Sequence, residues 1–317
     1  MKKIFNIETF LGRIVITIFG KNFSIRTKDD NLEFYKKAKK HNYDITTLPK
    51  NNGIVRQVQL ANMKILEELD YVCNAHNLKY WLAGGSMLGA IRHNGFIPWD
   101  DDIDTEMLRE DYDKLAEVFN STTRDKDLSI ELYRNGWKNR KCMCFYKIKH
   151  KKIPFLFVDI FPMETYHSKL NTEEKAALNN KIINLKTALN SSDESLTLDS
   201  MLLLEKIKKI TKKDILEDKE NKEDEPTLFW GLDFPHIWKN WTFDNETFFP
   251  LKKVKFEGKS FNCIANPESY LTQLYGNYMD YPKKIQFAHC ASIKISKKEY
   301  ELLNEFIKGC ELWKILR

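Results

Sequence analysis

The chain of 317 residues is long enough for one large domain or two small ones with a substantial core. Hydrophobic residues make up 42% of it and aromatic residues 13%, which excludes a protein that is disordered throughout. The 51 Lys and Arg against 45 Asp and Glu give a net charge of +6, and no stretch combines dense arginine with interleaved aromatic residues, so nucleic-acid binding is not expected. The mild positive charge fits an enzyme that handles phosphorylated substrates, or one that works near an anionic membrane surface.

Residues 4–20 are largely apolar but are interrupted by Glu8 and Arg13, and with these two charges the segment is too short and too polar to span a bilayer. No small-residue cleavage site follows it, so a signal peptide is not expected. Residues 13–26 predict a short β-hairpin, because β-branched residues precede a glycine turn. An interfacial amphipathic helix over residues 2–19 is the alternative.

The polar, charged residues 27–50 are expected to form a connecting arm. Apolar residues at helical spacing then predict a helix from Ile54 to His76. Residues 80–83 predict a short buried strand that enters a Gly-Gly turn, and Ser86 is expected to cap a helix that ends at Arg92.

Strands are also predicted over 102–107, 142–148 and 155–161, and helices over 109–119, 171–189, 202–216, 267–275 and 297–316. The strand over 155–161 is almost wholly apolar and therefore central in its sheet. Asn171 and Glu174 resemble a capping box, and the charged run 217–225 is expected to be a solvated loop. The expected organisation is an N-terminal hairpin and arm over 1–50 and a catalytic domain over 51–317, with a helical insertion at about 170–225.

The six cysteines contain no CxxC pair, which argues against a zinc site or a disulfide scaffold. We expect reduced thiols in a cytoplasmic protein, and association with the inner face of the membrane stays open.

Residues 82–107 carry two features that are informative together. The first is the Gly84-Gly85-Ser86 turn between a strand and a helix. Glycines let the backbone approach a ligand closely, and the N–H groups at a helix start attract phosphate. The turn is not a Walker loop, because no Gly-Lys-Ser/Thr follows it.

The second feature is Asp102-Ile103-Asp104. On a strand, residues two apart point to the same face, so both carboxylates are expected to converge. Like charges so close repel each other unless a cation lies between them, and hard oxygen ligands favour Mg²⁺ or Mn²⁺. A solvated acidic turn is the alternative, but apolar residues on both sides of this run argue against it.

Asp159 is the single charge within the apolar run 155–161. A buried, unpaired carboxylate is costly, so this side chain is expected to be the third metal ligand. A pair with a cationic side chain such as Lys147 is the alternative.

At this point the residues resemble a known family. Gly-Gly-Ser-Met-Leu-Gly-Ala-Ile-Arg-His at 84–93, followed by Gly-Phe-Ile-Pro-Trp-Asp-Asp-Asp-Ile-Asp at 95–104, is similar to the signature of LicD-type phosphotransferases, which include fukutin-related proteins. The resemblance extends from about residue 54 to residue 162, and it returns at 256–259 and 270–279.

The resemblance implies an α+β protein, in which helices flank a nucleotidyltransferase-like mixed sheet and helical additions lie at the C-terminus. It implies transfer of a phosphorylated alcohol from a CDP-activated donor to a hydroxyl of a glycan or glycolipid, with phosphocholine first and ribitol or glycerol phosphate next. The family's pattern falls on Gly85, Ser86, Asp102, Asp104 and Asp159. Its donor-side Lys-Ile is present at Lys147, but the Asn-Thr that often follows is absent.

We therefore expect Asp102, Asp104 and Asp159 to hold Mg²⁺ or Mn²⁺, with Asp104 or Asp159 accepting the proton of the attacking hydroxyl. The residues expected to bind the donor are Gly85, Ser86, Arg92 and Lys147. Arg92 pairing with the acidic run is the alternative for that residue.

A choline group would need aromatic side chains for its trimethylammonium. The candidates are Trp230, Trp238, Trp241, Tyr275, Tyr278 and Tyr281. His93 is expected to end a helix, whereas His289 belongs either to an acceptor-side wall or to the core.

Two other functions remain open. A nucleotidyltransferase with the same fold would transfer the nucleotide and release pyrophosphate. A glycan-binding protein without catalysis is the second, and the intact Asp-x-Asp argues against it.

Overall fold

The computed structural model describes residues 5–10, 13–18, 21–26, 30–134, 144–166, 168–192, 198–216, 225–234, 242–285 and 288–308, and of residues 5–26, 30 and 292 only the backbone. The charged run 217–225, apart from its last residue, lies outside the described residues, as do Trp238 and Trp241.

A seven-stranded mixed sheet lies at the centre of the fold. Its strands are β4 (Trp81–Leu82), β5 (Asp104–Leu108), β6 (Leu128–Arg134), β7 (Cys144–His150), β8 (Ile153–Tyr166), β9 (Thr227–Trp230) and β10 (Thr242–Asp244). The order β10-β9-β8-β5-β4 is extended by β7, which pairs with β8, and by β6. The parallel pair is β5 with β8, and the other pairs are antiparallel.

Strand β8 holds the sheet together. It pairs with β7 through its first half, with β5 through its middle and with β9 through its last residues. The prediction of a central apolar strand over 155–161 is confirmed, and the strand extends further at both ends.

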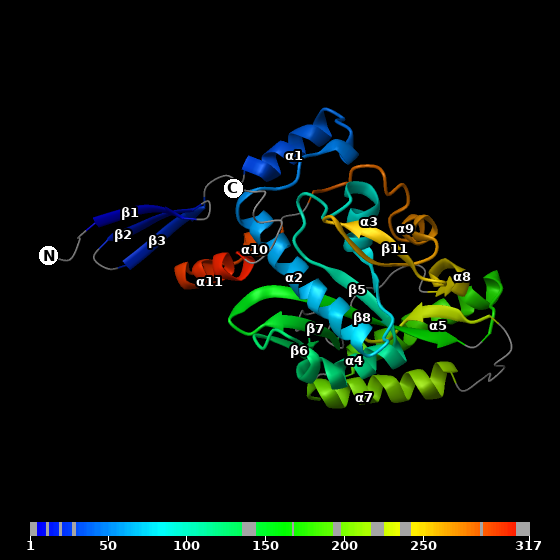
Figure 1. Ribbon diagram of the computed structural model, residues 1–317. Coiled ribbons are helices and arrows are strands. Elements are labelled where there is room, and N and C mark those ends of the chain that lie inside the picture. The colour runs from blue at the N-terminus through cyan, green and yellow to red at the C-terminus, as the bar shows by residue number, and fades with distance from the viewer. Residues whose placement is uncertain are drawn as a thin grey trace.

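The helices beside the sheet are α2 (Gly53–Ala75), α4 (Arg109–Thr122), α5 (Thr172–Ser191), α7 (Ser200–Thr211) with its π-helical continuation η2 (Lys212–Leu216), and α11 (Lys297–Ile307). Helix α2 contacts β8 and β7 and carries α11 against its side, whereas α7 contacts β6 and β7 (Figure 1). The α+β class with a mixed sheet and helical C-terminal additions is confirmed.

Smaller elements complete the fold. They are α1 (Asp30–Lys40), η1 (Ile45–Thr47), α3 (Gly84–His93), α8 (Asn245–Phe248), α9 (Pro267–Tyr275), α10 (His289–Ser292) and the hairpin of β11 (Lys252–Phe256) and β12 (Lys259–Cys263). The predicted helix over 267–275 is present with these bounds, and the one over 297–316 is described as far as Ile307. The capping box of Asn171 and Glu174 is also present.

The N-terminal strands β1 (Phe5–Phe10), β2 (Arg13–Ile18) and β3 (Lys21–Arg26) form an antiparallel sheet of their own. Residues 13–26 thus form paired strands, as a hairpin requires, and not the amphipathic helix that was the alternative. Among the described residues, no helix is long and apolar enough to cross a membrane.

The arm that follows is more regular than its composition suggests. Leu32, Tyr35 and Ala38 form a narrow apolar stripe on α1 among many lysines, and all three are buried in the common core. Residues 30–48 therefore pack as part of the main body.

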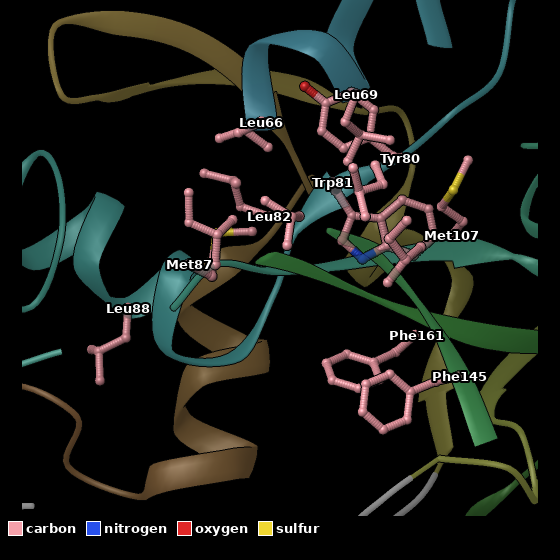
Figure 2. Packing of buried hydrophobic residues seen from close by; sticks show 14 of the residues in the cluster. Leu66, Leu69, Tyr80, Trp81, Leu82, Met87, Leu88, Met107, Phe145 and Phe161 are labelled. Atoms are coloured by element: carbon pink, nitrogen blue, oxygen red, sulfur yellow. The ribbon is translucent and has the colours of Figure 1, made fainter. Parts of the chain in front are cut away.

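The core continues between α2, the first strands of the sheet and α3. Figure 2 shows side chains from these elements meeting in one cluster, among them Leu66, Leu69, Tyr80, Trp81, Leu82, Met87 and Met107. The described cysteines are free and buried, in line with the expectation of reduced thiols.

Two local predictions near the glycine turn are wrong. Helix α3 begins at Gly84, and its N-cap is Ala83 without a side-chain cap, so Ser86 does not cap it. Strand β5 begins at Asp104, so Asp102 lies in the preceding loop and does not share a strand face with Asp104. The reason is that side chains of α2, and not a neighbouring strand, bind the backbone carbonyls at 100 and 101.

Candidate active site

Three charged residues form a row across the middle of the sheet. Asp104 on β5 lies opposite Asp159 on β8, and Asp159 lies opposite Lys147 on β7. The Lys147 ammonium is 2.6 Å from Oδ1 of Asp159 and donates a hydrogen bond of 2.9 Å to its Oδ2. The pair that was the alternative for Asp159 is therefore present, and it stands directly beside Asp104.

The loop before β5, residues 100–103, which we call the acidic loop, is held in place by side chains of α2. Gln59 donates a hydrogen bond of 2.6 Å to the carbonyl of Asp100, and Asn62 donates one of 2.7 Å to the carbonyl of Asp101. The Asn62 amide oxygen also accepts from the backbone N–H of Phe157 on β8. Two buried amides in an apolar helix face were the signal in the sequence that could have revealed this contact.

A second support comes from the C-terminal region. The backbone N–H groups of His289 and Cys290 donate to the two carboxylate oxygens of Asp101, over 2.6 and 2.8 Å. The His289 ring is 62% exposed, and its Nδ1 lies 3.4 Å from both Asp101 Oδ1 and Asp102 Oδ2. His289 is thus a wall residue at the acidic loop and not a core histidine.

The glycine turn lies against the carboxylates. A Cβ atom on Gly84 would lie 3.1 Å from Oδ2 of Asp104, and one on Gly85 would lie 3.3 Å from Oδ2 of Asp100. Gly84 also has a φ of +47°, a backbone conformation that would be strained for a residue with a side chain. The Ser86 hydroxyl oxygen accepts a hydrogen bond of 2.8 Å from the N–H of Asp104, so the turn and the start of β5 position each other.

Burial and the close spacing of charged groups shift several pKa values at the site. Burial, and next the charge of Asp102, raise the pKa of Asp100 and of Asp104 well above the ordinary value. Burial also raises the pKa of Asp159 to about 6, against the opposing effect of Lys147. The hydrogen bond to Asp101 raises the pKa of His289 to about 10.

This donor set fits a divalent cation. Besides burial, the charge of Asp102 raises the pKa of Asp100, Asp104 and Asp159, and a cation among these carboxylates would relieve the repulsion. Among the described residues, the ligand atoms that come within 4.8 Å of one another are those of Asp100, Asp101 and His289. The predicted set of Asp102, Asp104 and Asp159 is not this group, and Asp100 was not assigned from the sequence.

A cavity of about 560 Å³ opens beside the acidic loop. Its walls carry cationic, acidic and aromatic side chains, including Arg92, Trp99, Asp100, Tyr275, Tyr278, Asp280, Tyr281, Lys283, Lys284 and His289. Of the aromatic candidates from the sequence, three tyrosines line it. Trp230 is buried in the core instead.

Arg92 fixes one wall of this cavity. Its Nη1 donates to the carbonyl of Tyr278 over 2.7 Å and to that of Asp280 over 3.4 Å. Arg92 therefore binds the segment after α9 and, within the part of the chain that the structure describes, forms no ion pair with the acidic run. His93 is the last residue of α3, as predicted, and burial lowers its pKa to about 3.

A buried carboxylate lies behind the glycine turn. Glu106 accepts hydrogen bonds from Trp81 Nε1, Trp230 Nε1 and Tyr270 Oη, over 2.9, 2.7 and 3.0 Å. The Tyr270 hydroxyl in turn accepts from the N–H of Gly84 over 3.1 Å. Tyr270 therefore connects α9 to the first residue of α3.

Glu257, in the turn of the β11–β12 hairpin, holds the other side of α3. Its Oε2 lies 2.7 Å from both Arg56 Nη2 and Lys50 Nζ, and its Oε1 accepts from the N–H of Phe96 over 3.2 Å. A Cβ on Gly95 would collide with the Glu257 carboxylate, so a glycine at this position allows the two segments to pack. Nothing in the local sequence indicated the contact.

The chain is similar to known proteins over the part that carries this site. Residues 77–190 match the family model described as LicD/FKTN/FKRP, nucleotidyltransferase domain. The lipopolysaccharide cholinephosphotransferase LicD of Haemophilus influenzae is 27% identical over 255 residues, which cover 72% of this chain and 92% of that protein. The ribitol 5-phosphate transferase FKRP of Homo sapiens is 31% identical over 93 residues, which cover 29% of this chain and 18% of that protein. The matched segment contains the glycine turn, the acidic loop, Lys147 and Asp159, so the part of the chain that carries the candidate site is similar to LicD-type phosphotransferases.

Proposed function

We propose that the protein transfers a phosphorylated alcohol from a CDP-activated donor to a hydroxyl of a cell-surface glycan, in a reaction that depends on Mg²⁺ or Mn²⁺. The observation that carries the proposal is the position of the carboxylates of Asp104 and Asp100 beside Gly84 and Gly85, where a Cβ atom would be crowded, at the edge of a cavity. The names of the two relatives, one acting with phosphocholine on lipopolysaccharide and one with ribitol phosphate, support this substrate class.

The chain's own groups suit an attack at phosphorus. Asp100, Asp102, Asp104 and Asp159 would hold the cation, which, when bound, would offset the negative charge of the donor diphosphate. The hydrogen bond from Asp104 uses a lone pair of the Ser86 oxygen, so the hydroxyl proton of Ser86 can donate to a phosphate, beside the N–H of Gly85. Lys147 and Arg92 add positive charge.

In the proposed step, the glycan hydroxyl oxygen forms a bond to the phosphorus that carries the alcohol. The bond between this phosphorus and the bridging oxygen breaks, and CMP leaves with the electron pair. Asp104 or Asp159 accepts the proton of the hydroxyl. The products are CMP and a glycan phosphodiester.

Phosphocholine is the first choice of transferred group. Tyr275, Tyr278 and Tyr281 lie in the cavity wall, and their ring faces can attract a trimethylammonium by about 0.5–2 kcal/mol each. Ribitol phosphate and glycerol phosphate are the other two candidates for the transferred group.

The test is a donor screen. The protein is incubated with CDP-choline, CDP-ribitol or CDP-glycerol, Mg²⁺ or Mn²⁺ and lipopolysaccharide or teichoic acid, and CMP release and glycan phosphorylation are measured. Release of CMP that requires acceptor and metal supports the proposal. Release of pyrophosphate from CTP, with no CMP from any CDP-alcohol, would mean nucleotidyl transfer. Glycan binding without either product would mean a binding protein.

A further inference from the structure

A second cavity of about 440 Å³ lies next to the first, where the N-terminal arm meets the segment after α9. It is lined by Lys39, Asn42, Tyr43, Asp44, Ile45, Met279, Asp280 and Tyr281, and we call it the arm cavity. Asp280 and Tyr281 belong to the walls of both cavities. A ligand longer than one unit could therefore occupy both.

The backbone of the arm cavity is held in place by the end of α1. The N–H of Tyr43 donates to the carbonyl of Ala38, the N–H of Asn42 donates to that of Lys39, and Asn42 has φ of +52°. These bonds form a Schellman motif with asparagine in the left-handed position, which fixes where the Tyr43 side chain leaves the chain. The site is thus built before any ligand arrives.

The opposite wall is tied to the same arm. Lys39 Nζ donates to the carbonyls of Pro282 and Lys283, each over 2.6 Å. Tyr281 stacks on Trp99, with ring centroids 6.5 Å apart and an angle of 17° between the planes. Both walls are therefore connected to each other and to the wall of the main cavity.

The chemistry of the arm cavity indicates a neutral, polyhydroxylated ligand. Its charged side chains are one lysine, whose ammonium is engaged by two carbonyls, and two aspartates, Asp44 and Asp280. This balance disfavours a diphosphate, which the main cavity with Lys283 and Lys284 suits better. Tyr43 is 57% exposed, and an aromatic face beside amide and carboxylate groups can cover the apolar face of a sugar while its hydroxyls are hydrogen-bonded.

We propose that the arm cavity binds a sugar unit of the acceptor glycan, next to the unit whose hydroxyl is phosphorylated. The proposal rests on the proposed function for the identity of the reacting end. It assigns a role to residues 39–45, which lie outside the segment matched by the family model. An oligosaccharide that fills both cavities should bind more tightly than a single sugar.

The test measures binding without donor, so that it does not depend on turnover. Core oligosaccharide released from lipopolysaccharide by mild acid, and its terminal monosaccharide, are titrated into the full chain by calorimetry. The wild type should bind the oligosaccharide at least about tenfold more tightly than the monosaccharide. Tyr43→Ala should weaken oligosaccharide binding by about tenfold or more, and Tyr43→Phe, which keeps the ring, should restore most of it.

Tyr71→Ala is the matched control, because Tyr71 is also an exposed tyrosine at 39% and lies in neither cavity wall. It should bind the oligosaccharide as the wild type does. Equal binding by Tyr43→Ala, or no binding by the wild type, would overturn the proposal. Tyr43-dependent binding without CMP release would reject the proposed function alone, and acceptor-dependent CMP release unaffected by Tyr43→Ala would reject the arm cavity alone.

Discussion

Asp104 lies directly opposite Asp159 where β5 and β8 run parallel, so two residues with carboxylate side chains are neighbours on adjacent strands. Burial and the charges of Asp102 and Asp159 raise the pKa of Asp104, which shows that the ionised form is disfavoured without a cation. The arrangement costs stability in the metal-free protein and suits metal binding.

Asp104→Asn should lower phosphotransfer by about 10²-fold or more, the usual effect of removing one electrostatic group from an active site. The metal-free variant should melt no lower than the wild type, since a disfavoured charge has been removed. Asp127→Asn is the control, because Asp127 is exposed and pairs with Lys152 outside the site. Activity of Asp104→Asn within about tenfold of the wild type would reject its assignment.

Asp159→Ala should have two separable effects. It leaves the buried ammonium of Lys147 without its partner, which should cost about 3–5 kcal/mol of unfolding free energy. If Asp159 also binds the metal, the rise in melting temperature with Mg²⁺ or Mn²⁺ should disappear, since that rise follows occupancy. Melts with and without metal measure both effects. A full metal-induced rise in the variant would mean that Asp159 serves only Lys147.

Tyr270→Phe should lower kcat by about tenfold or more while the KM for the donor changes little. The lost hydroxyl accepts from Gly84 and donates to Glu106, so the start of α3 loses its support. The control is Tyr80→Phe, which removes a buried tyrosine hydroxyl bonded to Asp70 away from the site. Both variants should lose about 1 kcal/mol of stability. Equal kcat values in the two would contradict a positioning role.

Glu257→Gln should destabilise the protein in a pH-dependent way. Burial opposes ionisation of this carboxyl, but Arg56 and Lys50 outweigh it and lower its pKa. A lowered pKa in the folded state stabilises the fold above the unfolded value of about 4.3, and this stabilisation is lost as the pH falls through the folded value. The difference in unfolding free energy should therefore be about 3–5 kcal/mol at pH 7 and shrink below about pH 4. A difference independent of pH would reject the ionic contribution.

Removal of residues 1–29 should leave a folded enzyme with unchanged kcat, since β1–β3 pair only with one another among the described residues. Removal of residues 1–48 should lower the melting temperature, because it deletes the buried side chains of α1. Thermal melts and CMP release measure the two truncations. Equal melting temperatures would show that the arm contributes nothing to the core.

Much of the fold was accessible from local pattern. Helices with a clear apolar stripe, the apolar strand around Asp159 and the glycine turn were predicted because neighbours along the chain determine them. Strands β6 and β9–β12 were missed, since β9–β12 have at most five residues each and only Leu128 and Ile130 of β6 are buried. β11, for example, reads Lys-Lys-Val-Lys-Phe.

The site was predictable only in part. Asp100 was overlooked because alternation on a strand was applied to residues that form a loop. The supports from Tyr270 and His289 were beyond reach, since each comes from a segment far away in the chain and no local periodicity encodes the contact.

The contacts of the acidic loop also have a consequence for the order in which the protein is made. Its first support, α2, leaves the ribosome before the loop does, whereas Glu257, Tyr270 and the amide pair at 289–290 follow last. The signature segment, residues 84–104, is therefore synthesised well before Glu257, Tyr270 and the backbone amides at 289–290, which hold it in place. A nascent chain that ends before residue 290 carries the whole motif and still lacks the hydrogen bond from Cys290 to Asp101, so activity should appear only after residue 290 has been added.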